Sequence, residues 1–309
     1  MTEGRVVYLS GGVGGARLAH GLAHALRPEQ LTLVVNTGDD FSHWGLDVSP
    51  DLDTVMYTLA DLADVQRGWG LAEETFATLG VVERYGGEAW FQLGDRDLGT
   101  HIMRSHWRRQ GMRLTDITQR LCCGLGVQAR VLPMSDAPRE TMIDTAGGTL
   151  SFQDWLVRGR GQADVERVWF RGEAKATDDV LRALDEADLV VLGPSNPYVS
   201  IDPILTLPGV TERVRARRTV GVSPIVHGRA VKGPLARMLQ TLGRLEPEAG
   251  AVAQHYGGLL SGMVVEHGDE GSVHDMPVCG ADTIMQTREQ SLALAHSVLQ
   301  FAATLQGRP

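Results

Sequence analysis

The chain has 309 residues, of which 43% are hydrophobic and 22% are charged, so it can bury a substantial core. Its formal net charge of −9 argues against a broad nucleic-acid surface but leaves room for a local site that binds a small anion. The three cysteines show no CxxC spacing, so no zinc or redox motif is expected. No leader pattern and no run of about 20 apolar residues is visible, and we expect a cytoplasmic protein without a membrane partner.

The first elements form a strand, a helix and a second strand. Apolar runs at residues 5–9 and 31–36 lack strict alternation, which is typical of parallel strands covered on both faces. Between them, a helical stripe of apolar side chains predicts a helix over residues 16–26. The sequence therefore predicts a β-loop-α-β unit of a parallel sheet.

A glycine-rich turn joins the first strand to this helix. Its backbone N–H groups and the dipole of the following helix favour a phosphate, so we expect four phosphate- or nucleotide-binding residues: Gly11, Gly12, Gly14 and Gly15. The turn is not a P-loop, because GK[ST] is missing, and Arg17 stands where the dinucleotide motif has its third glycine. A tight structural turn is the alternative interpretation.

An acidic segment follows the second strand, over residues 36–54. It holds five carboxylates, namely Asp39, Asp40, Asp47, Asp51 and Asp53. Near a phosphate-binding turn, such a cluster favours Mg²⁺, which takes carboxylate and substrate phosphate oxygens. Ser49 and Pro50 are typical of the N-cap and first position of the next helix. Asp51 and Asp53 lie on roughly opposite sides of that helix, so we do not expect them to serve one site.

The later elements complete an α/β pattern. Residues 66–126 look mainly helical, residues 127–132 predict a strand, and residues 150–152 and 165–170 predict a small antiparallel element. Strands return at 189–192, 219–222 and 263–265, and Thr287 with Gln290 forms a capping box before the last helix. We expect a Rossmann-like parallel sheet core with a largely helical insertion. The chain would be one domain over 1–309, with a core of 1–65 and 180–309 and an insertion of about 66–175.

Three further loops carry polar groups that suit a ligand. After late strands, GPSNP offers Ser195 and Asn196, and SPIVHGRAVKGP offers three basic side chains, His227, Arg229 and Lys232. Loops in this position line the ligand crevice of open α/β sheets. In LGDRD, Arg96 is suited to bidentate contact with a phosphate or a planar heteroaromatic group, the alternative being a solvated salt-bridged loop.

Taken in order, several segments resemble one family. They are SGGVGGARL, NTGDD, SPDLDTVMY, LGDRDLGTHIMRS, LTDIT, LPMSD, FQDW, VLGPSNP and SPIVHGRAVKGP. The resemblance, to the 2-phospho-L-lactate transferase family of deazaflavin coenzyme F-420 biosynthesis, runs from about residue 6 to beyond residue 285. The ordered set is specific, above all PDLDT with LGDRD and GPSNP. The turn departs from the GGTGTPK form of archaeal-type members, which leaves the donor's acid open.

The resemblance implies a definite reaction. A three-carbon acid linked through a diphosphate to guanosine is the donor, and the ribityl hydroxyl of the deazaflavin Fo attacks the phosphorus that bears the acid, releasing GMP. The acid is phospholactate, phosphoenolpyruvate or 3-phosphoglycerate. Asp53 and Arg96 match Fo-binding positions. The resemblance further implies a Mg²⁺ cofactor and a homodimer.

Asp53 is the expected catalytic residue, either orienting the attacking hydroxyl or binding magnesium, and Asp40 is the second expected metal ligand. The lack of a catalytic triad does not count against phosphoryl transfer, which depends on positioning and charge neutralisation. Two other classes compete. A non-enzymatic nucleotide-sugar-binding regulatory protein, of the gluconeogenesis-factor-like type, would need neither Arg96 nor an Fo pocket. A nicotinamide oxidoreductase is disfavoured by the missing third glycine.

Overall fold

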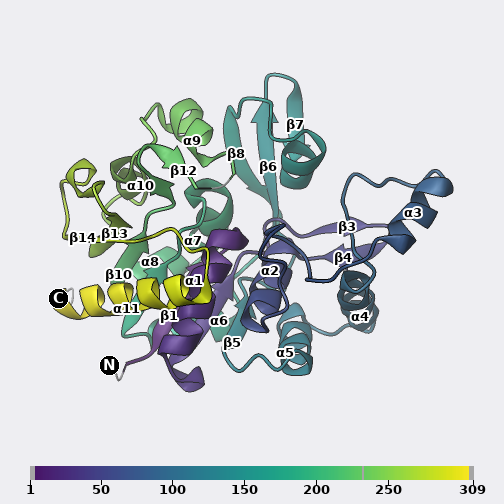
Figure 1. The fold of residues 1–309 in the computed structure, drawn as a ribbon, viewed down its shortest axis with the longest axis horizontal. Coiled ribbons are helices and arrows are strands. Elements are labelled where there is room, and N and C mark those ends of the chain that lie inside the picture. The colour runs from purple at the N-terminus through teal and green to yellow at the C-terminus, as the bar shows by residue number, and fades with distance from the viewer. Residues whose placement is uncertain (1–3, 232, 306–309) are drawn as a thin grey trace.

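A seven-stranded parallel sheet forms the centre of the computed structural model, which describes residues 4–231 and 233–305 (Figure 1). Every neighbouring pair of strands in it is parallel. In spatial order the strands are β14 (Val278–Ala281), β13 (Gly262–Glu266), β10 (Arg218–Val222), β9 (Leu189–Leu192), β1 (Val6–Ser10), β2 (Leu31–Val35) and β5 (Arg130–Pro133). The predicted α/β, Rossmann-like core is confirmed.

Helices cover both faces of this sheet, as its uninterrupted apolar strands require. Val6 and Tyr8 of β1 pack into one buried cluster, and Val7 and Leu9 pack into the other. The first face carries α1 (Gly12–Ala25), α2 (Pro50–Leu59), α5 (Leu114–Gly124) and α11 (Arg288–Thr304). The second carries α6 (Asp178–Asp185), α7 (Asp202–Leu205), α8 (Val210–Arg215), α9 (Leu235–Met238) and α10 (Ala249–His255).

Smaller elements surround the sheet. Hairpin β3 (Phe41–His43)–β4 (Leu46–Val48) lies with α3 (Ala77–Arg84) and α4 (Asp97–Arg109) on the side of the molecule away from both termini (Figure 1). A three-stranded antiparallel sheet has the order β7 (Gly148–Ser151), β6 (Glu140–Thr145) and β8 (Arg167–Arg171). A short hairpin is formed by β11 (Ile225–Val226) and β12 (Arg229–Ala230).

The structure refines several predicted boundaries. The helix predicted from residue 16 begins at Gly12, so most of the glycines belong to its first turn. Ser49 occupies the predicted N-cap position of α2, but its hydroxyl donates to Asp40 Oδ2 at 2.8 Å and does not cap the helix. The capping box of α11 is confirmed, because Thr287 N–H donates to Gln290 Oε1 at 3.0 Å and the reciprocal bond also forms.

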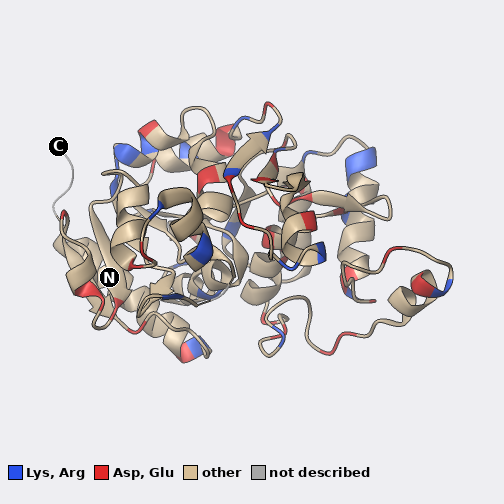
Figure 2. Ribbon diagram, turned by 90° about the horizontal axis from the view of Figure 1, so that it is seen from above, with Lys and Arg blue, Asp and Glu red and all other residues tan. Residues whose placement is uncertain are grey.

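The segment 66–175 contributes strands to the main parallel sheet and to the three-stranded antiparallel sheet. It supplies β5, which pairs with β2 at the edge of the main sheet, and it supplies the strands of the antiparallel sheet. Lys and Arg are interspersed with Asp and Glu along the ribbon (Figure 2). Among the described residues, no helix combines the length and the apolar character that a membrane crossing needs.

Candidate functional site

The polar loops named from the sequence meet at the carboxyl edge of the sheet. The glycine turn follows β1, the acidic segment follows β2, and the GPSNP loop follows β9, and these three strands are neighbours. This edge is the usual ligand crevice of open α/β sheets. The sheet topology therefore gathers the three segments into one candidate site.

Backbone conformation and close packing together explain the glycines of the turn. Gly12 has a φ of +67°, which side-chain-bearing residues rarely adopt. A Cβ on Gly14 would lie 2.8 Å from the carbonyl oxygen of Pro194, so only glycine permits this approach of α1 to the β9 loop. Ser195 Oγ donates to Gly11 O at 2.8 Å and accepts from Gly11 N at 3.3 Å. The β1 and β9 loops therefore brace one another.

Gly15 contributes to the same junction. A Cβ at this position would lie 2.6 Å from both Ser10 Oγ and Ser195 Oγ, and the Gly15 carbonyl accepts a hydrogen bond from Tyr8 Oη at 2.8 Å. A Cβ on Gly11 would likewise lie 2.9 Å from Ser200 Cβ. Three of the four glycines, Gly11, Gly14 and Gly15, thus have a packing reason as well as their predicted role toward phosphate.

An acidic side chain occupies the N-terminus of α1. Asp51 Oδ1 accepts a hydrogen bond from Gly12 N at 2.7 Å, and Asp51 Oδ2 accepts one from Asn36 Nδ2 at 2.9 Å. Burial raises the pKa of Asp51 to about 6, against the lowering effect of those two hydrogen bonds. A carboxylate at a helix N-terminus occupies the position that suits a phosphate. The Asp51 carboxylate therefore occupies the position predicted for a phosphate.

Two further carboxylates lie close to Asp51. Burial and the neighbouring charge of Asp51 raise the pKa of Asp39 well above its usual value, and burial does the same for Asp40. Among the described residues, Asp39 Oδ1 and Asp40 Oδ1 are buried without a hydrogen-bond partner. No three His, Cys, Asp or Glu side chains within residues 4–231 and 233–305 converge on a complete metal site. A cation here would need ligands from the substrate, as Mg²⁺ commonly has.

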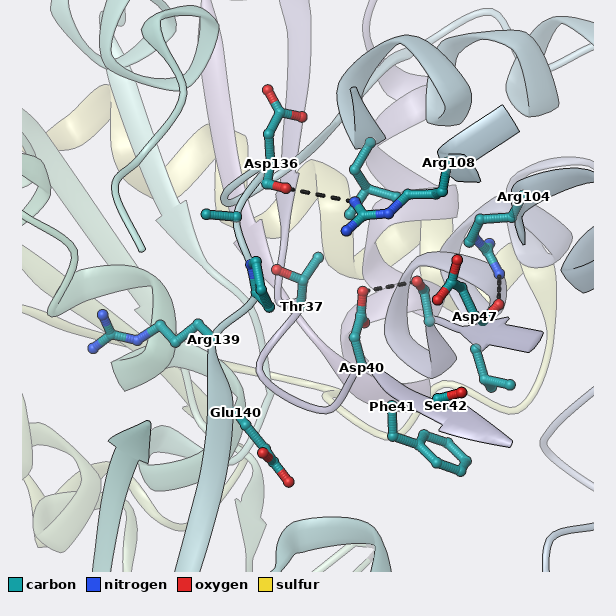
Figure 3. Close-up of a pocket in the computed structure, with 15 residues that line it drawn as sticks. Thr37, Asp40, Phe41, Ser42, Asp47, Arg104, Arg108, Asp136, Arg139 and Glu140 are labelled. Atoms are coloured by element: carbon teal, nitrogen blue, oxygen red, sulfur yellow. Dashed lines mark hydrogen bonds between the residues drawn. The ribbon is translucent and has the colours of Figure 1, made fainter. Parts of the chain in front are cut away.

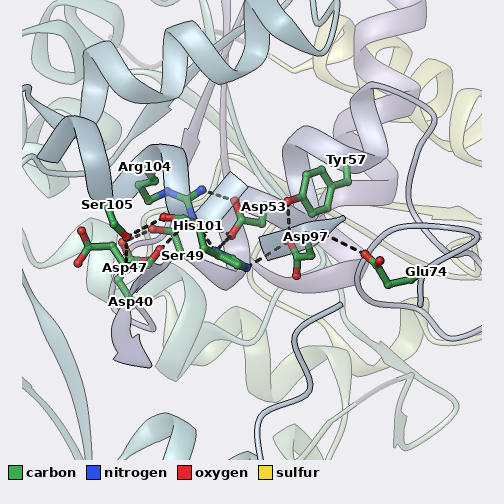
Figure 4. Close-up of polar contacts among 10 residues, drawn as sticks. All are labelled: Asp40, Asp47, Ser49, Asp53, Tyr57, Glu74, Asp97, His101, Arg104 and Ser105. Atoms are coloured by element: carbon green, nitrogen blue, oxygen red, sulfur yellow. Dashed lines mark hydrogen bonds and ion pairs between the residues drawn. The ribbon is translucent and has the colours of Figure 1, made fainter. Parts of the chain in front are cut away.

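Asp53 faces a different set of partners from Asp51, as its place on the helix predicts. It forms a bidentate ion pair with Arg104, whose side chain is 1% exposed (Figure 4). Arg104 Nη1 lies 3.2 Å from His101 Nδ1, so this nitrogen accepts and the proton of a neutral imidazole lies on Nε2. His101 Nε2 lies 3.2 Å from Asp97 Oδ1, which also accepts from Tyr57 Oη at 2.6 Å. This buried network fastens α4 to α2.

The LGDRD segment mainly organises helix ends. Asp95 accepts hydrogen bonds from the N–H groups of Ala77 and Thr78 at 2.9 Å each, which satisfies the N-terminus of α3. Arg96 donates to the carbonyl oxygen of Ala72 at 2.8 Å on the exposed side. Its backbone N–H donates to Glu74 Oε1 at 2.7 Å. Arg96 is nevertheless an exposed residue, at the N-cap position of α4.

The later loops have partners within the protein. Asn196 Oδ1 accepts from Tyr198 N at 3.0 Å, so this side chain supports the turn after β9. His227 N–H donates to Asp269 Oδ2 at 2.8 Å, and its ring lies beside the same carboxylate. Arg229 is exposed on β12.

The structure gives no support for a phosphate-binding role of two other basic residues named from the sequence. Arg17 donates to the carbonyl oxygen of Met285, and so turns toward the segment before α11. Lys232 lies outside the described residues.

A small cavity opens beside the acidic loop, at the carboxyl ends of β2 and β5 (Figure 3). Its volume is about 220 Å³. Thr37 and Asp40 line it from the loop after β2, Arg104 and Arg108 from α4, and Arg139 from the loop before β6. The cavity thus combines acidic and basic side chains.

Sequence patterns alone indicate no role for Arg104, Arg108 or Asn36. A signal for Arg104 exists, because Asp97, His101 and Arg104 follow the i, i+4, i+7 spacing of one helix face. Charged residues on a helix face are usually solvated, so the spacing alone does not indicate a buried network.

Comparisons with known proteins find one matching family and similar proteins of nearly the same length. The family model described as 2-phospho-L-lactate transferase CofD matches residues 6–279. The chain is 42% identical over 321 residues to phosphoenolpyruvate transferase of Thermobifida fusca, covering 98% of this chain and 99% of that protein. It is 40% identical over 302 residues to 2-phospho-L-lactate transferase of Methanosarcina mazei, covering 96% and 99%. A crystal structure of a UPF0052 family protein from Bacillus halodurans, 17% identical, superposes with a TM-score of 0.65 over 97% of this chain and 99% of that one, and shows the fold alone.

The Asp53–Arg104 pair gives a stability prediction. Replacing Arg104 by Met leaves the Asp53 carboxylate buried without its cation, and we expect the free energy of unfolding to fall by about 3–5 kcal/mol. The double variant R104M/D53N should recover part of this loss, because no uncompensated charge remains. Urea unfolding measures both, with the exposed R109M as the control. A loss in R104M no larger than that in R109M would contradict the importance of the pair.

Asp51 gives a prediction about pH. Its folded-state pKa of about 6 exceeds the ordinary 3.8, so the folded protein binds more protons than the unfolded chain between these values. The stability contributed by this group is therefore lost as pH rises from about 4 to 6. The variant D51N has no carboxylate here and so does not lose this stability. The free energy of unfolding of D51N minus that of the original protein should therefore increase by up to about 3 kcal/mol between pH 4 and pH 6.

The same substitution also removes the Asp51 charge that raises the pKa of Asp39, and this change increases the difference in the same direction. Urea titrations of both proteins at pH 4, 5, 6 and 7 measure the difference. A difference that stays flat with pH would show that Asp51 keeps an ordinary pKa.

Proposed function

The chain belongs to the 2-phospho-L-lactate transferase CofD family, and from this premise we propose that it transfers a phosphorylated three-carbon acid to the deazaflavin Fo in coenzyme F-420 biosynthesis. The observation that carries the proposal is the family match over residues 6–279, which includes the three loops gathered at the sheet edge. The donor is the acid linked through a diphosphate to guanosine. Relatives named for phospholactate and for phosphoenolpyruvate are about equally similar, so the comparison does not choose between these two acids, and 3-phosphoglycerate is kept as the third candidate.

The proposed step is a substitution at phosphorus. The terminal ribityl hydroxyl oxygen of Fo bonds to the phosphorus that bears the acid, and the bond from that phosphorus to the GMP oxygen breaks. GMP leaves, and the hydroxyl proton passes to solvent or to the departing phosphate. A loose transition state needs little general-base power, so the protein acts mainly by positioning the reactants and neutralising charge.

We assign the donor diphosphate to the turn between β1 and α1. Backbone N–H groups at the start of a 14-residue helix favour an anion there, and the braced Gly11–Ser195 contact keeps the neighbouring loop close. Asp51 must then leave Gly12 N–H or carry a proton, and a pKa of about 6 makes protonation accessible near neutral pH. Asn196 and the β11–β12 hairpin would lie on the guanosine side.

Asp53 and Arg96 are assigned to the acceptor. Arg104 holds both oxygens of the Asp53 carboxylate, and so fixes its direction. We propose that Asp53 orients the ribityl hydroxyl as a hydrogen-bond acceptor. Arg96, exposed at the start of α4, would contact the flat deazaflavin, because a guanidinium plane stacks on aromatic faces.

Mg²⁺ fits Asp40 better than Asp53. Asp40 Oδ1 is buried without a hydrogen-bond partner among the described residues, whereas the Asp53 charge is already neutralised by Arg104. Asp40, with donor phosphate oxygens, would hold the ion. Bound there, Mg²⁺ would neutralise charge on the transferring phosphoryl group.

We also propose that the protein is a homodimer and works in the cytoplasm. The resemblance of the motifs supports a homodimer, and the biosynthetic role supports a cytoplasmic enzyme. A nucleotide-sugar-binding regulatory protein is not favoured, because the relatives at 40–42% identity are named as transferases, while the UPF0052 likeness concerns the fold alone.

A mass-spectrometric assay tests the function. Purified protein is incubated with Fo, Mg²⁺ and each of the three guanosine-diphosphate-linked acids. We expect a phosphodiester of Fo together with stoichiometric GMP, and the product mass identifies the acid. Absence of product with all three donors, together with no binding of Fo, would refute the transferase.

Arg96 offers a second test. Replacing Arg96 by Ala should raise the dissociation constant of Fo by roughly tenfold, because a cationic contact to the acceptor is lost, and leave that of GDP within about twofold. Fo fluorescence and calorimetry with GDP measure the two constants. R84A, at the end of α3, is a matched surface control. Equal weakening of both ligands would refute the assignment of Arg96 to the acceptor.

A further inference from the structure

Arg108 is a half-buried cation without an acidic partner. Among the described residues, no Asp or Glu carboxylate forms an ion pair with it, and its Nη1 reaches the carbonyl oxygen of Asp136 at a long 3.5 Å. The Asp136 carboxylate is turned away, accepting from Thr115 N at 2.7 Å and Thr115 Oγ1 at 2.8 Å, where it caps α5 (Figure 3). Most of the donors of Arg108 are therefore available to a ligand.

The cavity that Arg108 lines has other unmatched polar groups. Thr37 is 3% exposed, and in the part of the chain that the structure describes its hydroxyl has no hydrogen-bond partner. Oδ1 of Asp40, on the same loop, is also unmatched there, and it is the oxygen assigned above to Mg²⁺. Buried polar groups normally have partners, so unmatched groups around one cavity indicate a place for a polar ligand.

The size of the cavity limits what it can hold. Its volume of about 220 Å³ is below the roughly 300–1,000 Å³ typical of sites that enclose a drug-sized ligand. A deazaflavin or a guanosine does not fit inside, whereas a carboxylate-bearing group of three carbons does.

The cavity also lies close enough to the turn assigned to the diphosphate for one donor molecule to reach both. That turn ends β1, the cavity lies at the ends of β2 and β5, and these strands are consecutive in the sheet. Neighbouring strands are about 4.8 Å apart, so roughly 5–10 Å separate the two places. A donor whose diphosphate lies at the β1 turn can therefore extend its acid into the cavity.

We propose that this cavity is the subsite for the three-carbon acid of the donor, and that Arg108 binds the carboxylate of that acid. The inference rests on the proposed function. A guanidinium binds a carboxylate through two parallel hydrogen bonds, and the unmatched hydroxyl of Thr37 supplies a further donor. The ribityl chain of the acceptor is uncharged and gives no reason for an unpaired cation here.

Arg139 does not share this role, although it lines the opposite wall. Its Nη2 donates to Thr206 Oγ1 at 2.7 Å, and its guanidinium lies 4.7 Å from the ring centroid of Phe170. Figure 3 shows its side chain directed away from Arg108. Arg108 is therefore the determinant of binding for the acid.

The variant R108Q tests the proposal against the matched control R109Q. Arg109 is the next residue on α4, is exposed, and donates to Gly45 O outside the cavity. With Fo, Mg²⁺ and the phospholactate or phosphoenolpyruvate donor, we expect R108Q to raise the donor KM by roughly 10- to 100-fold. The dissociation constants of GDP and Fo should stay within about twofold. R108K, which keeps the charge but not the two parallel bonds, should give an intermediate KM.

Three outcomes would overturn the inference. An unchanged donor KM in R108Q and R108K would show that the carboxylate binds elsewhere. Equal weakening of GDP would assign the cavity to the diphosphate, and weakening of Fo would assign it to the acceptor. If R108Q does not fold, as judged by its melting temperature, R108K decides alone. Failure of the unmodified protein to form any product would instead refute the proposed function, and the inference with it.

Discussion

The arrangement of the polar loops at the carboxyl edge of the sheet depends on the hydrogen bonds of the Asp51 carboxylate. It accepts from the backbone at the start of α1 and from the side chain of Asn36 after β2, while its own backbone opens α2. One buried side chain therefore ties three segments to the carboxyl ends of two neighbouring strands. The same contact places a negative group where an anionic substrate would bind. In the proposed function, the donor diphosphate and the Asp51 carboxylate therefore compete for the same backbone N–H group.

Asp53, two residues further along α2, organises the other side of the site. Because a helix turns by about 200° over two residues, one short helix presents Asp51 to the sheet and Asp53 to α4. The ion pair with Arg104 then fixes α4, which also carries Arg108 and begins beside Arg96. We infer a division of labour in which the sheet edge holds the diphosphate, α4 contributes to binding of the acid and the acceptor, and α2 links the two.

The sequence predicts the parts of this account that depend on local patterns. Apolar runs locate β1, β2, β9, β10 and β13, and the Thr287–Gln290 capping box marks the start of α11. What it misses depends on distant contacts. Ser49 has the right position for a cap, but Asp40 takes its hydroxyl. Asp95 looks like a solvated charge until α3 folds back onto it from 17 residues away. The buried role of Arg104 likewise requires Asp53, which lies 51 residues earlier.

A crystal structure with GDP bound tests the central claim, that the β1–α1 turn is the diphosphate site. We predict that the β-phosphate accepts hydrogen bonds from backbone N–H groups at the start of α1, and that Asp51 has moved from Gly12 N–H or lies within hydrogen-bond distance of a phosphate oxygen as its protonated form. A diphosphate bound at another loop, with Asp51 still receiving the Gly12 N–H and making no contact with the ligand, would contradict the account.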